Sequence, residues 1–163
     1  MNAPGHIVSS ATVGVAVGAT TGSLETGVAF FLAGWSIDLD HFLDFAITWG
    51  LREAFVRMSR MGIGVRNRPT TAFMFLHGYE VSALLWALAL WFAPSPWLLG
   101  AAMGHLFHLL LDQTANLKAW SPTYFLTYRG LHRFSHDAAF PDHITRNPAP
   151  PAPVLCRDPS RET

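Results

Sequence analysis

Residues 104–113 read GHLFHLLLDQ and place two histidines and an aspartate inside an otherwise apolar run. His108 and Asp112 are four residues apart, so on an α-helix they lie about 40° apart on one face. His105 extends this stripe by one further step of three residues. Because one metal ion can bridge an i, i+4 pair, the stretch predicts an apolar helix that carries metal ligands.

The composition limits the class of protein. Half of the 163 residues are hydrophobic and only 13% are charged, whereas about 25% are charged in ordinary soluble proteins. The formal net charge is zero, and nucleic-acid binders carry a basic surplus, so we expect no nucleic-acid partner. The single cysteine, Cys156, excludes a disulfide framework and a thiolate zinc cluster within one chain.

The basic residues are confined to two parts of the chain. Lys and Arg are absent from Met1 to Leu51 and again from Pro69 to Leu117, and five arginines lie between Arg52 and Arg68. Two apolar blocks therefore flank a basic loop. One membrane crossing takes roughly 20 residues, so each block is long enough to cross twice.

These blocks predict an all-α integral membrane bundle of about four transmembrane helices. The expected helices run over about residues 7–22, from about Glu25 into the DLDHFLDF stretch, over 71–93 and over 96–117, with turns at Thr20–Ser23 and Pro94–Pro96. The positive-inside rule places the basic loop and both termini in the cytoplasm. The loop itself is either a short interfacial helix or a solvated connector. Residues 1–140 then form one helical domain, followed by a disordered Pro-rich tail over 141–163.

Ligand-type side chains occur in all four predicted helices. They are His6; Asp38, Asp40, His41 and Asp44; His77 and Glu80; and His105, His108 and Asp112. A rise of about 1.5 Å per residue puts members from each helix at one level, roughly 18–24 Å from the predicted outer turns. Neither block contains Lys or Arg. A bound metal ion is therefore the simplest source of positive charge to neutralise these carboxylates. Imidazole and carboxylate without thiolate suit zinc, manganese or iron, and the number of groups permits one or two ions.

Simpler explanations stay open for single residues. A lone histidine such as His105 is more often a hydrogen-bonded packing residue than a ligand, and Asp44 could cap a helix or pair with Arg52. Asp38 and Asp40 lie about 160° apart on a regular helix, so they share a face only if the helix ends or bends there.

The segments GHIVSSATVG, DLDHFLDF, FLHGYE, GHLFHLLLDQTAN and YFLTYR resemble a family of bacterial inner-membrane proteins described as metal-dependent hydrolases, distant relatives of zinc-dependent phospholipase C. The likeness covers roughly Gly5 to Arg133. It implies an inner-membrane location and a divalent metal, most often zinc. The implied metal ligands are His6, Asp38, His41, His77, His108 and Asp112.

Two functions remain open from the sequence. In the first, the protein is a membrane-embedded hydrolase of a phosphoester or lipid-like ester near the cytoplasmic face, with Asp40 or Glu80 as general base and membrane lipids as partners. In the second, the metal is structural and the protein is a non-catalytic scaffold. An open coordination position would distinguish the enzyme from the scaffold.

Overall fold

The computed structural model is all-helical over the residues that it describes, which are 3–59, 69–115 and 122–140. The elements are α1 (Ala3–Thr21), α2 (Leu24–Ser36), the 3-10 turn η1 (Ile37–Asp40), α3 (His41–Trp49), α4 (Leu51–Ser59), α5 (Tyr79–Trp91), α6 (Pro96–Ala115), the 3-10 turn η2 (Pro122–Tyr124), α7 (Leu126–Leu131) and α8 (His136–Ala139). The all-α part of the sequence prediction is confirmed. The predicted tail over 141–163 lies outside the described residues.

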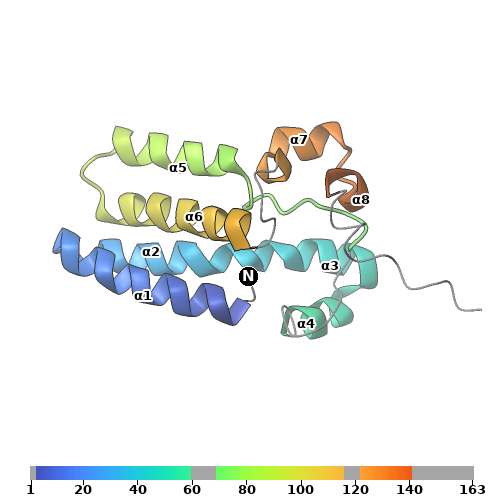
Figure 1. The fold of residues 1–163 in the computed structure, drawn as a ribbon, viewed down its shortest axis with the longest axis horizontal. Helices are drawn as coiled ribbons and strands as arrows, with labels where there is room; N and C mark the ends of the chain where they lie inside the picture. The colour runs from blue at the N-terminus through green and yellow to red at the C-terminus, as the bar shows by residue number, and fades with distance from the viewer. Residues whose placement is uncertain (1–2, 60–68, 116–121, 141–163) are drawn as a thin grey trace, which may run out of the picture.

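Four helices lie in the order α1, α2, α6, α5 and form one half of the molecule (Figure 1). The α2–α6 pair is its centre, because two glycines let the helix backbones meet. A Cβ at Gly100 would overlap the carbonyl oxygen of Thr26, and one at Gly104 would overlap that of Phe30. The buried core around this contact includes Ala29, Phe30, Ala102 and Leu109.

The turn between α1 and α2 lies where the sequence predicts it. Gly22 has a φ of 65°, a left-handed conformation that glycine adopts without strain. Ser23 then caps α2, since its side chain accepts a hydrogen bond from the backbone N–H of Thr26. The predicted break at residues 94–96 is also confirmed, because α5 ends at Trp91 and α6 begins at Pro96.

The second predicted helix is interrupted around the DLDH motif. Helix α2 ends at Ser36, η1 follows, and the chain resumes a regular helix at His41 as α3. The irregular turn meets the condition that the sequence sets for Asp38 and Asp40 to serve one site. Beyond Gly50 the chain reverses into α4, where Phe55 packs on Phe42 and the Arg57 guanidinium lies 3.9 Å from the centre of the Trp49 ring.

The third predicted helix begins later than expected. Residues 69–78 form an irregular segment, and α5 starts only at Tyr79. The buried Asp44 carboxylate accepts hydrogen bonds from the hydroxyl of Thr71 and from the backbone N–H groups of Phe73 and Met74. Met74 also has a φ of 27°, which lies outside the right-handed helical region. This contact also replaces the predicted capping role of Asp44 or its pairing with Arg52.

The C-terminal helices η2, α7 and α8 cover the same segment. Ala72 donates a backbone hydrogen bond to Phe134, and Thr71 forms an isolated antiparallel bridge with Ser135. Figure 1 shows α7 and α8 in the half that also contains α3 and α4, beside the four-helix half.

The predicted membrane-spanning bundle is wrong for the described residues, as is the inner-membrane location that rested on it. None of the helices in those ranges combines the length and the apolar character needed to cross a bilayer. Helices α2 and α5 have 13 residues each, which at 1.5 Å per residue spans about 20 Å against the roughly 30 Å of hydrocarbon. Helices α1 and α6 are long enough, but Gly, Ser, Thr, His and Asp dilute their apolar character.

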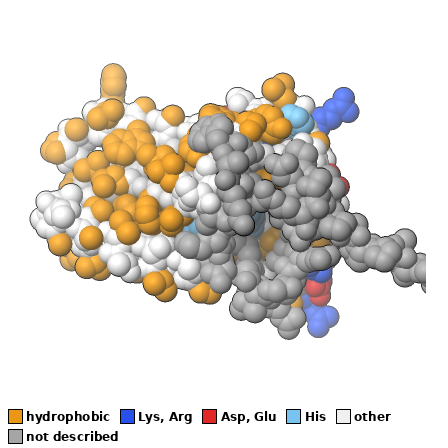
Figure 2. All heavy atoms as spheres, in the orientation of Figure 1, with side chains coloured by type: hydrophobic (Ala, Val, Ile, Leu, Met, Phe, Trp, Pro, Cys, Tyr) orange, Lys and Arg blue, Asp and Glu red, His pale blue; other side chains and the backbone are white. Residues whose placement is uncertain are grey.

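Apolar and charged side chains are segregated on the surface. On the face drawn in Figure 2, hydrophobic side chains gather over the half built from α1, α2, α5 and α6. The Lys, Arg, Asp and Glu side chains in view gather at the opposite end. Leu24, Val15 and Trp91 are 79%, 75% and 82% exposed.

Candidate metal centre

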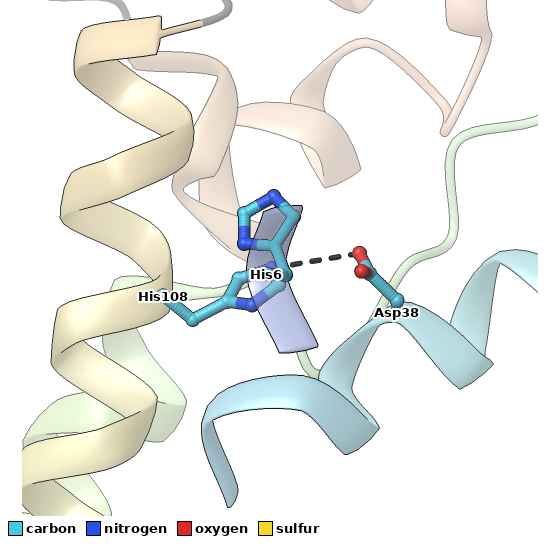
Figure 3. Close-up of side chains that lie close together, drawn as sticks. All are labelled: His6, Asp38 and His108. Atoms are coloured by element: carbon cyan, nitrogen blue, oxygen red, sulfur yellow. Dashed lines mark ion pairs between the residues drawn. The ribbon is translucent and has the colours of Figure 1, made fainter. Parts of the chain in front are cut away.

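Five of the predicted ligands meet in one buried place, although four separate segments carry them. His6 comes from α1, Asp38 from η1, His77 from the irregular segment, and His108 and Asp112 from α6. Figure 3 shows the ring of His6 against that of His108, with the Asp38 carboxylate pointing towards them. The two ring centres lie 4.1 Å apart in a stacked arrangement.

Four side-chain atoms define the middle of the site, which we call the central cluster: Nε2 of His77, Nε2 of His108, Oδ1 of Asp38 and Oδ2 of Asp112. The two nitrogens are 3.3 Å apart. The Asp38 oxygen lies 3.6 Å from each of them. The Asp112 oxygen lies 3.4 Å from His108 and 3.7 Å from His77. The side chains are buried, and Asp38, at 10%, is the most exposed of the four.

The outer nitrogen of each central histidine fixes the orientation of its ring. His108 Nδ1 lies 2.7 Å from the carbonyl oxygen of Gly34, which can only accept, so Nδ1 carries the proton. His77 Nδ1 lies 2.9 Å from Oδ1 of Asp40 and donates to that carboxylate. A ring held in this way by its other nitrogen is the usual arrangement of a metal-binding histidine. Both Nε2 atoms are thereby turned towards the centre.

Asp112 is held between two histidines. Its Oδ1 lies 3.0 Å from Nε2 of His6, while its Oδ2 faces the central cluster. His6 therefore orients the Asp112 carboxylate and stacks on the His108 ring, which places it next to the centre.

The segment that carries His77 is held by buried polar side chains from three directions. Asp40 Oδ2 accepts from the Leu76 backbone N–H. His105 Nε2 donates to the Leu76 carbonyl at 2.8 Å. Arg129, which is fully buried, donates from its two terminal nitrogens to the carbonyls of Met74 and His77.

Sequence reasoning missed Arg129, and for His105 it favoured packing over a ligand role. Arg129 is one of the six basic residues from Lys118 onward, so its spacing carries no signal of burial. A weak indication was its position within the YFLTYR segment that follows the α6 motif. The hydrogen bond of His105 confirms the packing alternative for that residue, and burial lowers its pKa to about 4.

Two further predicted residues lie outside the central cluster. The His41 ring packs beside that of His77, with 4.7 Å between the ring centres, and a nitrogen of His41 is close enough to join Asp38 and His77 around an ion. Glu80 points elsewhere. Its carboxylate accepts from the backbone N–H groups of Leu126 and Thr127 and from the Thr127 hydroxyl, at the N-terminus of α7.

The charges and burial of the site shift the pKa values of its histidines and carboxylates. Burial alone would lower the pKa of His77, but its contacts with Asp38 and Asp40 and the charge of Asp112 raise it to about 10. Burial likewise opposes ionisation of Asp112, yet its bonds to His108 and His6 hold the pKa of that carboxyl well below its usual range. The pKa values of Asp38 and Asp40 are also lowered, against burial, mainly by His77. The metal-free site therefore holds negative carboxylates around the His77 imidazolium.

The structure thus defines an all-helical protein with a buried histidine–aspartate cluster that could hold a metal ion. Three overlapping groups have ligand atoms close enough to share an ion: His6, Asp38 and His108; Asp38, His41 and His77; and His77, His108 and Asp112. Comparisons with protein-family models, with curated proteins and with solved structures find no match. The resemblance to metal-dependent hydrolases stays a prediction.

Proposed function

We propose that the protein is a metal-dependent hydrolase that uses one divalent ion, best suited by zinc, at the central cluster. The observation that carries the proposal is the 3.3 Å separation between Nε2 of His77 and Nε2 of His108. Two nitrogens bound at about 2.05 Å to a tetrahedral zinc ion lie about 3.3 Å apart. Without a proton or a cation between them, two inward lone pairs at this distance would repel each other.

One oxygen of Asp38 and one of Asp112 each lie near both nitrogens. Their distances of 3.4–3.7 Å to the two nitrogens exceed the zinc value by a few tenths of an ångström. Small rotations of Asp38 and Asp112 would close that difference. Each of the three candidate groups contains at least two of these four residues, and the proposal places one ion among them.

The chemistry of the donors favours catalysis. Structural zinc sites are built mainly from cysteine, whereas two histidines and a carboxylate are a ligand set of catalytic zinc with a water in the fourth position. Here His77, His108 and Asp112 would be the three ligands. Asp38, the most exposed of the four, would stand beside the water position.

The residues of this chain then have separate tasks in ester hydrolysis. A bound divalent ion lowers the pKa of water and stabilises the negative charge that develops on the ester oxygen. Asp38 would take the proton from the attacking water as the new bond to the phosphorus or carbonyl carbon forms. It would return that proton to the leaving oxygen as the bond to that oxygen breaks. Asp40 fixes the His77 ring and His6 fixes the Asp112 carboxylate, so both ligands are preorganised. The substrate class is a phosphoester or another polar ester.

A structural metal site is the second candidate, and one observation favours it. Two nitrogens and two carboxylate oxygens, with N–O distances of 3.4–3.7 Å, are available as donors, and a structural site is closed by four protein ligands. In that arrangement Asp38 is a ligand and not a base.

The substitution Asp38→Asn separates the two candidates. If Asp38 is the base, the variant should keep its metal and its melting temperature, while turnover of a phosphoester panel falls by roughly 10² to 10⁴. If Asp38 is a ligand, metal content and melting temperature should fall together. Asp137→Asn, an exposed acid on α8, is the matched control. A wild-type protein that binds metal and hydrolyses no member of the panel would contradict the enzyme proposal.

A further inference from the structure

Three helices come close together at Gly34, which is buried near the end of α2. A Cβ at Gly34 would lie 2.6 Å from Oγ and 3.1 Å from Cβ of Ser10 on α1, and 3.5 Å from the carbonyl oxygen of Gly104 on α6. Ser10 itself has no exposed surface. Because Gly34 has no side chain, α1 can approach α2 at this level more closely than any other residue would allow.

Gly34 also holds one residue of the central cluster directly. Its carbonyl oxygen accepts a hydrogen bond from Nδ1 of His108 at 2.7 Å. Gly34 lies in the last turn of α2, where the carbonyl groups have no N–H partner four residues further on within the helix. The oxygen is therefore free to orient the His108 ring, which turns Nε2 towards the central cluster.

The second ligand on α6, Asp112, is connected to Gly34 through α1. Ser10 and His6 are four residues apart on α1, so they lie on one face, one turn from each other. Nε2 of His6 lies 3.0 Å from Oδ1 of Asp112, and the His6 ring stacks on that of His108. Because one turn of helix moves as a unit, the depth at which Ser10 rests on Gly34 sets the position of the His6 ring.

Ser10 acts at this contact through its size. Its hydroxyl has no hydrogen-bond partner among the residues that the structure describes, whereas the hydroxyl of Ser9 donates to the carbonyls of Gly5 and His6. Rotation of the Ser10 hydroxyl would relieve the approach at 2.6 Å but not the one at 3.1 Å, because the backbone fixes the position of Cβ. A methyl group at Gly34 would therefore displace α1.

We propose that Gly34 is a positioning residue of the metal centre. It holds His108 through its carbonyl oxygen. By having no side chain it also lets Ser10 settle against α2, at the depth where His6 orients the Asp112 carboxylate. One residue of α2 thus fixes both ligands that α6 supplies. This inference rests on the metal site of the proposed function.

Gly34→Ala in the full-length, cobalt-substituted protein tests the proposal. The added Cβ pushes α1 away from α2, so we expect the affinity for cobalt to fall roughly tenfold or more. The visible spectrum, which reports the ligand geometry, should change with it. Ser10→Gly removes both atoms that the Cβ would meet. The double variant Gly34→Ala with Ser10→Gly should therefore recover the wild-type spectrum and most of the affinity.

Gly27→Ala is the matched control. Its Cβ would lie 2.7 Å from the carbonyl oxygen of Gly14, at the same interface between α1 and α2. Gly27 is about 10 Å from Gly34 along α2, at 1.5 Å per residue. The control should lower the melting temperature, as Gly34→Ala does, but leave the cobalt spectrum unchanged.

The metal-free protein gives a second readout that needs no ion. The His6 ring stacks on the His108 ring with 4.1 Å between their centres, so the NMR signals of the His108 ring protons depend on the position of His6. Gly34→Ala should shift these signals, and Ser10→Gly in the same chain should return them.

Two outcomes would overturn the proposal. A wild-type cobalt spectrum and unshifted His108 signals in Gly34→Ala would limit Gly34 to general packing. Changes that Ser10→Gly does not reverse would exclude the route through Ser10 and His6. A wild-type protein that binds no cobalt would instead contradict the proposed function, and the NMR signals would still decide whether Gly34 positions His6.

Discussion

The Nε2 atoms of His77 and His108 face each other at 3.3 Å, while the other nitrogen of each ring is held by Asp40 and by the carbonyl oxygen of Gly34. Each ring thus has one nitrogen committed to the protein and one directed at a shared point. Asp38 and Asp112 supply negative charge at the same point. This arrangement predicts the metal content, the pH dependence of metal affinity and the pH dependence of stability.

The first prediction concerns metal content. His108→Ala combined with Asp112→Ala removes two of the four donors from one helix face, so purified protein should lose most of its bound metal, measured by mass spectrometry of the elements. His132→Ala is the control, because His132 bonds the Tyr128 carbonyl and takes no part in the central cluster. Full metal content in the double variant would show that the ion binds elsewhere.

The second prediction concerns the pH dependence of metal affinity. A metal can bind Nε2 of His77 only after that nitrogen loses its proton, and the pKa of His77 in the metal-free protein is raised to about 10. Affinity should therefore rise about tenfold per pH unit between roughly pH 7 and 9, with release of one proton per ion. Chelator competition at several pH values measures this slope. Affinity that does not change over that range would contradict the imidazolium assignment.

The third prediction concerns the stability of the metal-free protein. Because the folded pKa of His77 is above the unfolded value of 6.5, its contribution is fully present below about pH 6.5 and is lost as the pH rises through about 10. The lowered pKa values of Asp38, Asp40 and Asp112 act oppositely, so their contribution is present above about pH 4 and is lost on further acidification. The lowered pKa of His105, about 4, likewise removes stability as the pH falls from about 6.5 to 4. Urea unfolding should thus show its highest midpoint near pH 6.5. His77→Gln should remove most of the alkaline loss, and an unchanged alkaline slope in that variant would assign the effect to another group.

The fourth prediction assigns a positioning role to Arg129. Lysine keeps the charge but cannot reach two carbonyls with a planar fork, so Arg129→Lys should release the segment that presents His77. We expect metal affinity to fall roughly 10- to 100-fold, together with an altered visible spectrum of the cobalt-substituted protein. The exposed neighbour Arg133 provides the control variant Arg133→Lys. An Arg129→Lys spectrum identical to wild type would limit Arg129 to general stability.

The fifth prediction tests whether Glu80 is a general base. Its carboxylate caps the start of α7 through Leu126 and Thr127, so Glu80→Gln should cost about 1 kcal/mol of stability, the typical value of a lost cap. Metal content and turnover should stay near wild type. Turnover reduced to the level of Asp38→Asn would instead support the catalytic role that the sequence suggested for Glu80.

Local sequence signals predicted the features that depend on neighbouring residues. Backbone preference predicted the Gly22–Ser23 turn and the break before Pro96. Helical spacing predicted the shared face of His108 and Asp112. The irregular segment over 69–78 could not be predicted in this way. Its conformation is set by hydrogen bonds that Asp44 accepts and Arg129 donates, and these residues lie 30 and 55 positions from Met74 along the chain. The membrane prediction failed because it counted apolar block lengths, whereas the helices within those blocks are shorter or more polar than a span requires.

The sequence by itself determined that the protein is helical and that histidines and carboxylates, without thiolates, would have to be neutralised inside apolar segments. It also determined that His108 and Asp112 share one face of α6, since a spacing of four residues fixes a common face on any helix. Only the tertiary structure decided which candidates meet: it brought His77 and Asp38 to His108, and directed Glu80 to α7 and His105 to the Leu76 carbonyl. The physical reason is that the direction of a side chain depends on the path of the backbone, and at η1 and in the segment over 69–78 that path is set by hydrogen bonds between residues distant in sequence.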